Sequence, residues 1–218
     1  MFCVGLGVFT ASNVGADTMP VNGSELQFMG RYFTGAGLGG AEISAYDADT
    51  KRLFITNGAK NTIDIVDISV LRKPKLVKAV DFTALGSSGI QSVAARNGVV
   101  VVAAAGATKT APGKLFIMDS NGAMHKGLPS GLTVGALPDS VTISKDGSYA
   151  VSANEGEPSD YCLVNGVLPE TSDPKGSISI VDLTAKVPTV KTVDFTADRK
   201  STRLNSSHVS ESRMPSSA

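Results

Sequence analysis

The segment TIDIVDIS at residues 62–69 recurs as SISIVDLT at 177–184. A second pair of copies, VDFTA, occupies 80–84 and 193–197, and KLFIMD at 114–119 is a weaker copy of the first motif between them. Self-similarity at a regular spacing is typical of repeat architectures. A β-sandwich, the other common all-β arrangement, does not require near-identical strand sequences at distant positions. The repeat therefore predicts copies of one structural unit.

Each unit contains four short segments that alternate apolar and polar residues or are apolar throughout, as β-strands do. The predicted strands are 41–46, 52–57, 62–67 and 75–82, then 92–95, 99–105, 114–119 and about 132–134, then 140–144, 149–154, 177–182 and 189–195. Asn97-Gly98 and Asp146-Gly147 suit two-residue hairpin turns between first and second strands. Four antiparallel strands in a unit of about 50 residues predict an all-β fold, a partial β-propeller of about three blades.

Three blades do not close a ring, so we expect an exposed blade face and an exposed sheet edge. Residues 24–33, SELQFMGRYF, are expected to form one more strand before the first blade.

Both ends of the chain differ from this repeat. Residues 1–16 contain no charged residue and combine an apolar core with small residues before Asp17, which predicts a secretory signal peptide and export. An apolar first strand is the alternative. Residues 198–218 lack periodicity and are rich in serine, which is typical of a disordered tail. Their text also matches a translated sequencing adapter, which predicts a non-native segment and leaves residues 17–197 as the propeller.

Composition excludes several classes of function. The 218 residues include 20 basic and 20 acidic side chains, and this balance without long basic runs predicts no nucleic-acid binding. No apolar stretch reaches the roughly 18 residues of a transmembrane helix. Two cysteines, Cys3 and Cys162, are too few for a disulfide framework.

The connection at 155–176 is far longer than its counterparts at 58–61 and 106–113, and it carries five acidic residues against one lysine. Long loops in compact domains are commonly functional or disordered. Carboxylate and amide oxygens suit Ca²⁺. The predicted metal ligands are Asp139, Asn154, Glu155 and Glu157. The alternative is a solvated acidic loop in which asparagines cap strand ends, and Lys109 is expected to be a solvated side chain.

Three stretches, at 37–69, 134–161 and 173–183, resemble the choice-of-anchor I family, whose secreted or surface-anchored propellers include mesenchyme-specific cell-surface glycoprotein-like proteins. The most specific text is PDSVT at 138–142 and NEGEP at 154–158. The resemblance covers about residues 24–197 and implies an N-terminal fragment of the family's exported propeller domain. Members are commonly labelled alkaline-phosphatase-like.

Two functions are consistent with these observations. The first is a surface-associated β-propeller that binds an unidentified ligand or cell-surface partner. The second is a metal-dependent, alkaline-phosphatase-like phosphoesterase whose site is completed by further blades. No catalytic residue is predicted, because the chain has no nucleophile elbow and no cysteine–histidine pair in a suitable context.

Overall fold

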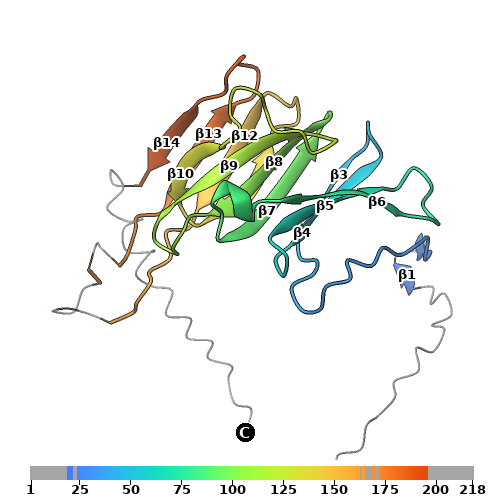
Figure 1. Ribbon diagram of the computed structural model, residues 1–218, viewed down its shortest axis with the longest axis horizontal. Coiled ribbons are helices and arrows are strands. Elements are labelled where there is room, and N and C mark those ends of the chain that lie inside the picture. The colour runs from blue at the N-terminus through green and yellow to red at the C-terminus, as the bar shows by residue number, and fades with distance from the viewer. Residues whose placement is uncertain (1–18, 22–23, 163, 165–167, 170–171, 196–218) are drawn as a thin grey trace, which may run out of the picture.

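A computed structural model describes residues 19–21, 24–162, 164, 168–169 and 172–195 (Figure 1). The predicted signal peptide at 1–16 and the tail at 198–218 lie outside these residues, as does Glu170 of the long acidic connection.

Three four-stranded antiparallel sheets, each paired in chain order, form the body of the molecule. Blade 1 contains β3 (Ser44–Asp47), β4 (Arg52–Asn57), β5 (Thr62–Asp67) and β6 (Lys75–Asp81). Blade 2 contains β7 (Gly89–Arg96), β8 (Val99–Ala105), β9 (Pro112–Asp119) and β10 (Leu132–Ala136). Blade 3 contains β11 (Pro138–Ile143), β12 (Tyr149–Asn154), β13 (Ser177–Asp182) and β14 (Val190–Asp194). Within the described residues the helical content is one 3-10 turn, η1 (Thr83–Leu85).

The blades pack side by side, and their first strands meet (Figure 1). Strand β7 contacts β3 and β4 of blade 1 and β11 of blade 3. Successive four-stranded meanders that meet through their first strands are blades of a β-propeller. The predicted all-β, three-bladed partial propeller is confirmed.

Two apolar cores lie between the blades, one on each face of blade 2. Phe54, Ile63 and Ile65 of blade 1 pack against Val102, Phe116 and Met118 of blade 2. On the other face, Val101, Leu115 and Ile117 pack against Val141, Ala150 and Val181 of blade 3. Because both faces of blade 2 are covered, residues 100–104 of β8 are fully buried. This explains why β8 is a continuous apolar run and not an alternating one.

The two predicted hairpin turns differ. Asn97 and Gly98 both have positive φ, 51° and 77°, as a two-residue type I′ turn requires. Gly147 has a φ of 80°, but Asp146 does not share the left-handed conformation. The Asp146 carboxylate instead accepts hydrogen bonds from Ser144 and Ser148 inside a longer turn that closes between Ser144 and Tyr149. The prediction of a two-residue turn is therefore wrong at this position.

The predicted strand over 24–33 is wrong beyond Leu26. Strand β2 (Ser24–Leu26) pairs with β1 (Met19–Val21), and residues 27–33 form no strand. A strand requires a neighbouring edge with free backbone groups. The segment instead crosses blade 1, where Gly30 lies too close to the Leu71 carbonyl to admit a Cβ atom, and Tyr32 reaches Asp64.

Asp64 is a buried carboxylate on the face of blade 1 that points away from blade 2. Its side chain is 2% exposed and accepts hydrogen bonds from Tyr32 Oη (3.1 Å), Asn57 Nδ2 (3.3 Å) and Thr62 Oγ1 (2.9 Å). Three donors offset the cost of desolvating the charge. Burial, with the nearby charge of Asp64 and its hydrogen bond, raises the pKa of Tyr32 to about 12.

The repeat supplies a matched pair of positions for testing the interblade core. Ile65 in β5 and Ile180 in β13 are equivalent, but Ile65 is fully buried against blade 2 whereas Ile180 is only partly buried. Ile65→Ala is expected to cost about 2–5 kcal/mol of unfolding free energy, and Ile180→Ala less than half of that. Urea denaturation of the full chain measures both. Equal losses would contradict the packing described here.

The raised pKa of Tyr32 predicts a loss of stability in strong base. A pKa that is higher in the folded state stabilises the fold fully below the unfolded value of about 10, and this contribution is lost as the pH rises through about 12. An ultraviolet titration of the tyrosines should show a step near pH 12 that is absent in Tyr32→Phe. Asp64→Asn should move that step toward pH 10, and an unchanged step in both variants would refute the assignment.

Candidate functional site

The connections at 58–61, 106–111 and 155–176 all lie at one rim of the molecule, because each joins the second strand of a blade to the third. In Figure 1 the described residues of the connection at 155–176, coloured orange, project away from the sheets. Together with Asp139 these connections form a surface that we call the acidic rim, whose described carboxylates are those of Asp139, Glu155, Glu157, Asp160 and Asp173.

Asn154, a predicted metal ligand, lies between blades 2 and 3 and is 3% exposed. Its Nδ2 donates hydrogen bonds to Ser177 Oγ (3.0 Å) and Ser179 Oγ (2.9 Å). Gly135 of β10 approaches Asn154 and Ser177 too closely to carry a side chain. The amide of Asn154 therefore packs the blade interface, and its Oδ1 has no hydrogen-bond partner among the described residues.

Asp139 and Glu155 are both exposed and lie at the same edge of blade 3. The ladder between β11 and β12 is irregular between Pro138 and Ser140, which leaves Asp139 outside the regular pairing. The backbone N–H of Glu155 donates to the Leu137 carbonyl at 2.8 Å. Leu137 has a φ of 48°, a conformation that a bulky residue adopts only when its surroundings require it.

Glu157 connects the long loop to blade 2. Its Oε1 lies 2.5 Å from Lys109 Nζ in the connection at 106–111, and it also accepts a hydrogen bond from the Tyr161 hydroxyl at 3.0 Å. The hydrogen bond from Lys109 is the main cause of the lowered pKa of Glu157, and the same bond raises the pKa of Lys109. The expectation of a solvated Lys109 missed this ion pair, because sequence alone does not show that two distant loops meet.

Within the loop, backbone groups hold the chain in shape. The N–H of Ser159 donates to the Ser172 carbonyl at 2.8 Å and closes the base of the loop. The N–H of Cys162 donates to Asp160 Oδ1 at 2.9 Å. The neighbouring Asp160 carboxylate raises the pKa of the exposed Cys162 thiol, mainly through a side-chain hydrogen bond. Because the thiolate is the nucleophilic form, Cys162 is a poor nucleophile.

The four predicted calcium ligands are thus in different environments. Asp139 and Glu155 share an exposed edge, Glu157 is paired with Lys109, and Asn154 is buried between blades. In the part of the chain that the structure describes, no three His, Cys, Asp or Glu side chains gather closely enough to hold a metal ion. The calcium site stays a prediction.

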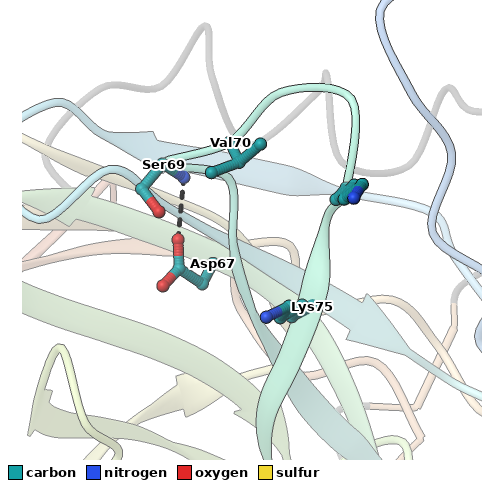
Figure 2. Close-up of a pocket in the computed structure, with 5 residues that line it drawn as sticks. Asp67, Ser69, Val70 and Lys75 are labelled. Atoms are coloured by element: carbon teal, nitrogen blue, oxygen red, sulfur yellow. Dashed lines mark hydrogen bonds between the residues drawn. The ribbon is translucent and has the colours of Figure 1, made fainter.

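A small pocket lies at the opposite rim, in the hairpin between β5 and β6. Its lining residues are Asp67, Ser69, Val70, Lys73 and Lys75 (Figure 2). The N–H of Ser69 donates to Asp67 Oδ1 at 2.7 Å. Hydrogen bonds from Ser69, followed by the charges of Arg52 and Lys75, lower the pKa of Asp67. The functional residues predicted from the sequence do not include this hairpin, although its basic residues at 72–75 are a visible signal.

The fold and the long loop define this chain as a β-propeller module with one extended acidic connection. The chain belongs to the choice-of-anchor I family, since the model of the choice-of-anchor I domain matches residues 42–217. The resemblance of the sequence to that family is therefore confirmed, and membership places the chain among cell-surface or exported proteins. The match continues through most of residues 198–218, whose adapter-like origin stays a prediction. No helix among the described residues has the length and apolar character to cross a membrane.

Several solved structures of longer chains are similar to part of this chain. Hydrazine synthase of Kuenenia stuttgartiensis shares 16% identity at a TM-score of 0.43, over 71% of this chain and 37% of that chain. A nidogen/laminin complex shares 9% sequence identity at a TM-score of 0.43, over 69% of this chain and 47% of that chain. A hypothetical selenium-binding protein from Sulfolobus tokodaii shares 15% sequence identity at a TM-score of 0.41, over 66% of this chain and 33% of that chain. The chain spans less than half the length of each, and no curated protein matches it.

The ion pair between Lys109 and Glu157 makes a prediction about pH. A carboxyl whose folded pKa is lowered stabilises the fold above its ordinary value of 4.5, and this contribution is lost as the pH falls through the lower folded value. Lys109→Met should raise the pKa of Glu157 toward 4.5, as measured by carboxyl NMR titration. Because solvent screens this exposed pair, the loss of stability at pH 7 should be small. An unchanged Glu157 titration would contradict the ion pair.

Proposed function

We propose that the chain is part of an exported, surface-associated propeller that binds a positively charged ligand or partner on the acidic rim. The observation that carries this proposal is the contact of Glu157 with Lys109 and Tyr161, which holds the start of the long loop against the 106–111 connection of blade 2. Side chains that are already held in place lose less conformational entropy when a partner binds. The apolar, uncharged segment at 1–16 supports export.

The charge of the rim defines the chemistry of the partner. Asp139, Glu155 and Asp160 are exposed, and complementary charge on the partner speeds encounter and excludes wrong partners. A basic protein segment fits this surface. Ca²⁺ fits it as well, with Asp139 and Glu155 supplying carboxylate oxygens at one edge, and Asn154 Oδ1 and Glu157 as the predicted further ligands.

The proposal can be tested by titrating the full chain with an oligolysine peptide and, separately, with CaCl₂ in a calorimeter. Glu155→Lys should weaken oligolysine binding at least threefold, because it reverses one exposed charge on the rim. Asp49→Lys is the matched control, since Asp49 is also exposed but lies at the opposite rim. Equal losses in both variants would refute recognition by the acidic rim.

The same preparations distinguish binding from catalysis. The wild-type chain could hydrolyse p-nitrophenyl phosphate in a Ca²⁺-dependent reaction that Glu155→Gln abolishes. That result would overturn the binding function and favour a metal-dependent phosphoesterase. If Ca²⁺ tightens oligolysine binding and no hydrolysis occurs, the cation has a structural role in the binding module. We expect no hydrolysis by the wild-type chain or by Glu155→Gln, and we expect oligolysine binding that depends on the acidic rim.

A further inference from the structure

The rim opposite the acidic rim has the reverse charge. Its connections join first to second and third to fourth strands, at 48–51, 68–74, 97–98, 120–131, 144–148 and 183–189. Their exposed basic residues are Lys51, Arg72, Lys73, Lys126, Lys145 and Lys186, whereas their acidic residues are Asp49 and Asp146, with Asp67, Asp119 and Asp182 at the strand ends of the same rim. We call this surface the basic rim. The meander thus separates charge between the two rims of a chain whose formal net charge is zero.

The hairpin between β5 and β6 is the most basic part of this rim. Arg72 and Lys73 lie in its turn and Lys75 follows at the start of β6, all three exposed. The only acidic lining residue of its pocket, Asp67, already accepts the Ser69 N–H (Figure 2). Neither Arg72 nor Lys73 has an ion pair within the described part of the chain, so both charges face solvent.

The same hairpin exposes large apolar side chains next to these cations. Val70 is 58% and Leu71 is 49% exposed at the turn, and Leu76 and Val77 in β6 are 48% and 44% exposed. Figure 2 shows Val70 at the base of the turn, beside Ser69. Apolar side chains on a projecting turn are costly in water unless they meet an apolar surface.

The segment that crosses blade 1 adds aromatic residues to the hairpin. Gly30 packs against the Leu71 carbonyl and Pro74, which places the neighbouring Arg31 beside the turn. The guanidinium of Arg31 lies 5.7 Å from the ring centre of Phe28 and 5.4 Å from that of Phe33. These rings are 55% and 73% exposed. Cations interleaved with exposed aromatic and aliphatic groups are the composition of interfacial membrane anchors.

We propose that the basic rim, led by the β5–β6 hairpin, docks peripherally onto a membrane surface that contains anionic lipid. The cations would meet lipid phosphates, each contributing through the surface potential, and Val70 and Leu71 would enter the boundary between headgroups and acyl chains. An acidic polysaccharide would use the cations but would leave these apolar side chains in water. The acidic rim would then face away from the membrane, because the anionic surface repels it.

Docking through the basic rim goes beyond the proposed function and is independent of it, since the two use opposite rims. Co-sedimentation of the full chain with phosphatidylglycerol/phosphatidylcholine vesicles and with pure phosphatidylcholine vesicles tests it. The chain is expected to sediment only with the anionic vesicles and to be released by raised salt, because exposed charges are screened. Arg72→Glu/Lys73→Glu should lower the partition coefficient at least about tenfold.

Two further variants make the test specific. Lys60→Glu/Lys175→Glu changes the net charge equally but at the opposite rim, and it should bind like the wild type. Val70→Ser/Leu71→Ser keeps the charges and should lower the partition coefficient about threefold or more through lost apolar contact. Circular dichroism of each variant shows whether the blades remain folded.

Three outcomes would overturn the proposal. One is equal loss of binding in the two charge-reversal variants, which would indicate a net-charge effect. Another is binding that the serine variant leaves unchanged, together with retention on immobilised heparin, which would identify a polysaccharide surface. The third is no sedimentation of the folded wild-type chain with anionic vesicles at low salt.

Discussion

Each blade is a sheet with two faces, and the burial of these faces against neighbouring blades supports the rest of the structure. Among the three described blades, blade 2 is the one with another blade packed on each face, and residues 100–104 of its second strand are fully buried as a result. Blades 1 and 3 each have another described blade on one face. Ile180 of blade 3 is only partly buried, whereas the equivalent Ile65 of blade 1 is sealed against blade 2. Loops at both rims take their positions from this stack.

The repeat also places polar residues at equivalent points with different consequences. Asn154, Ser177 and Ser179 are buried between blades 2 and 3, where Asn154 Nδ2 donates neutral hydrogen bonds to both serine hydroxyls. In blade 1 the equivalent of Ser179 is Asp64, a charged group on the face that blade 2 does not cover. Tyr32 from the preceding segment contributes the third donor to its carboxylate. The same repeat position is therefore a neutral residue packed between blades in blade 3, and in blade 1 a carboxylate that binds the crossing segment at 27–33.

Antiparallel meanders send alternate connections to opposite rims, and this geometry organises the surface chemistry. The long loop collects carboxylates at one rim, where Glu157 joins Lys109 across the blade boundary. Basic connections collect at the other rim, beside the exposed Val70 and Leu71. The two rims therefore suit partners of opposite charge, although the formal net charge of the chain is zero.

The sequence by itself determined the local structure. Alternation and apolar runs located all twelve blade strands, and the copies at 62–69 and 177–184 identified the repeat, because a strand's pattern reflects which of its faces are buried. It could also place Asp139 and Glu155 at one edge, since both lie beside paired strand ends.

Tertiary structure decided what depends on contacts between distant segments. Residues 27–33 alternate like a strand but pair with none, Asn154 lies inside a blade interface, and Lys109 meets Glu157. Such contacts follow from how the blades stack, which local patterns do not encode.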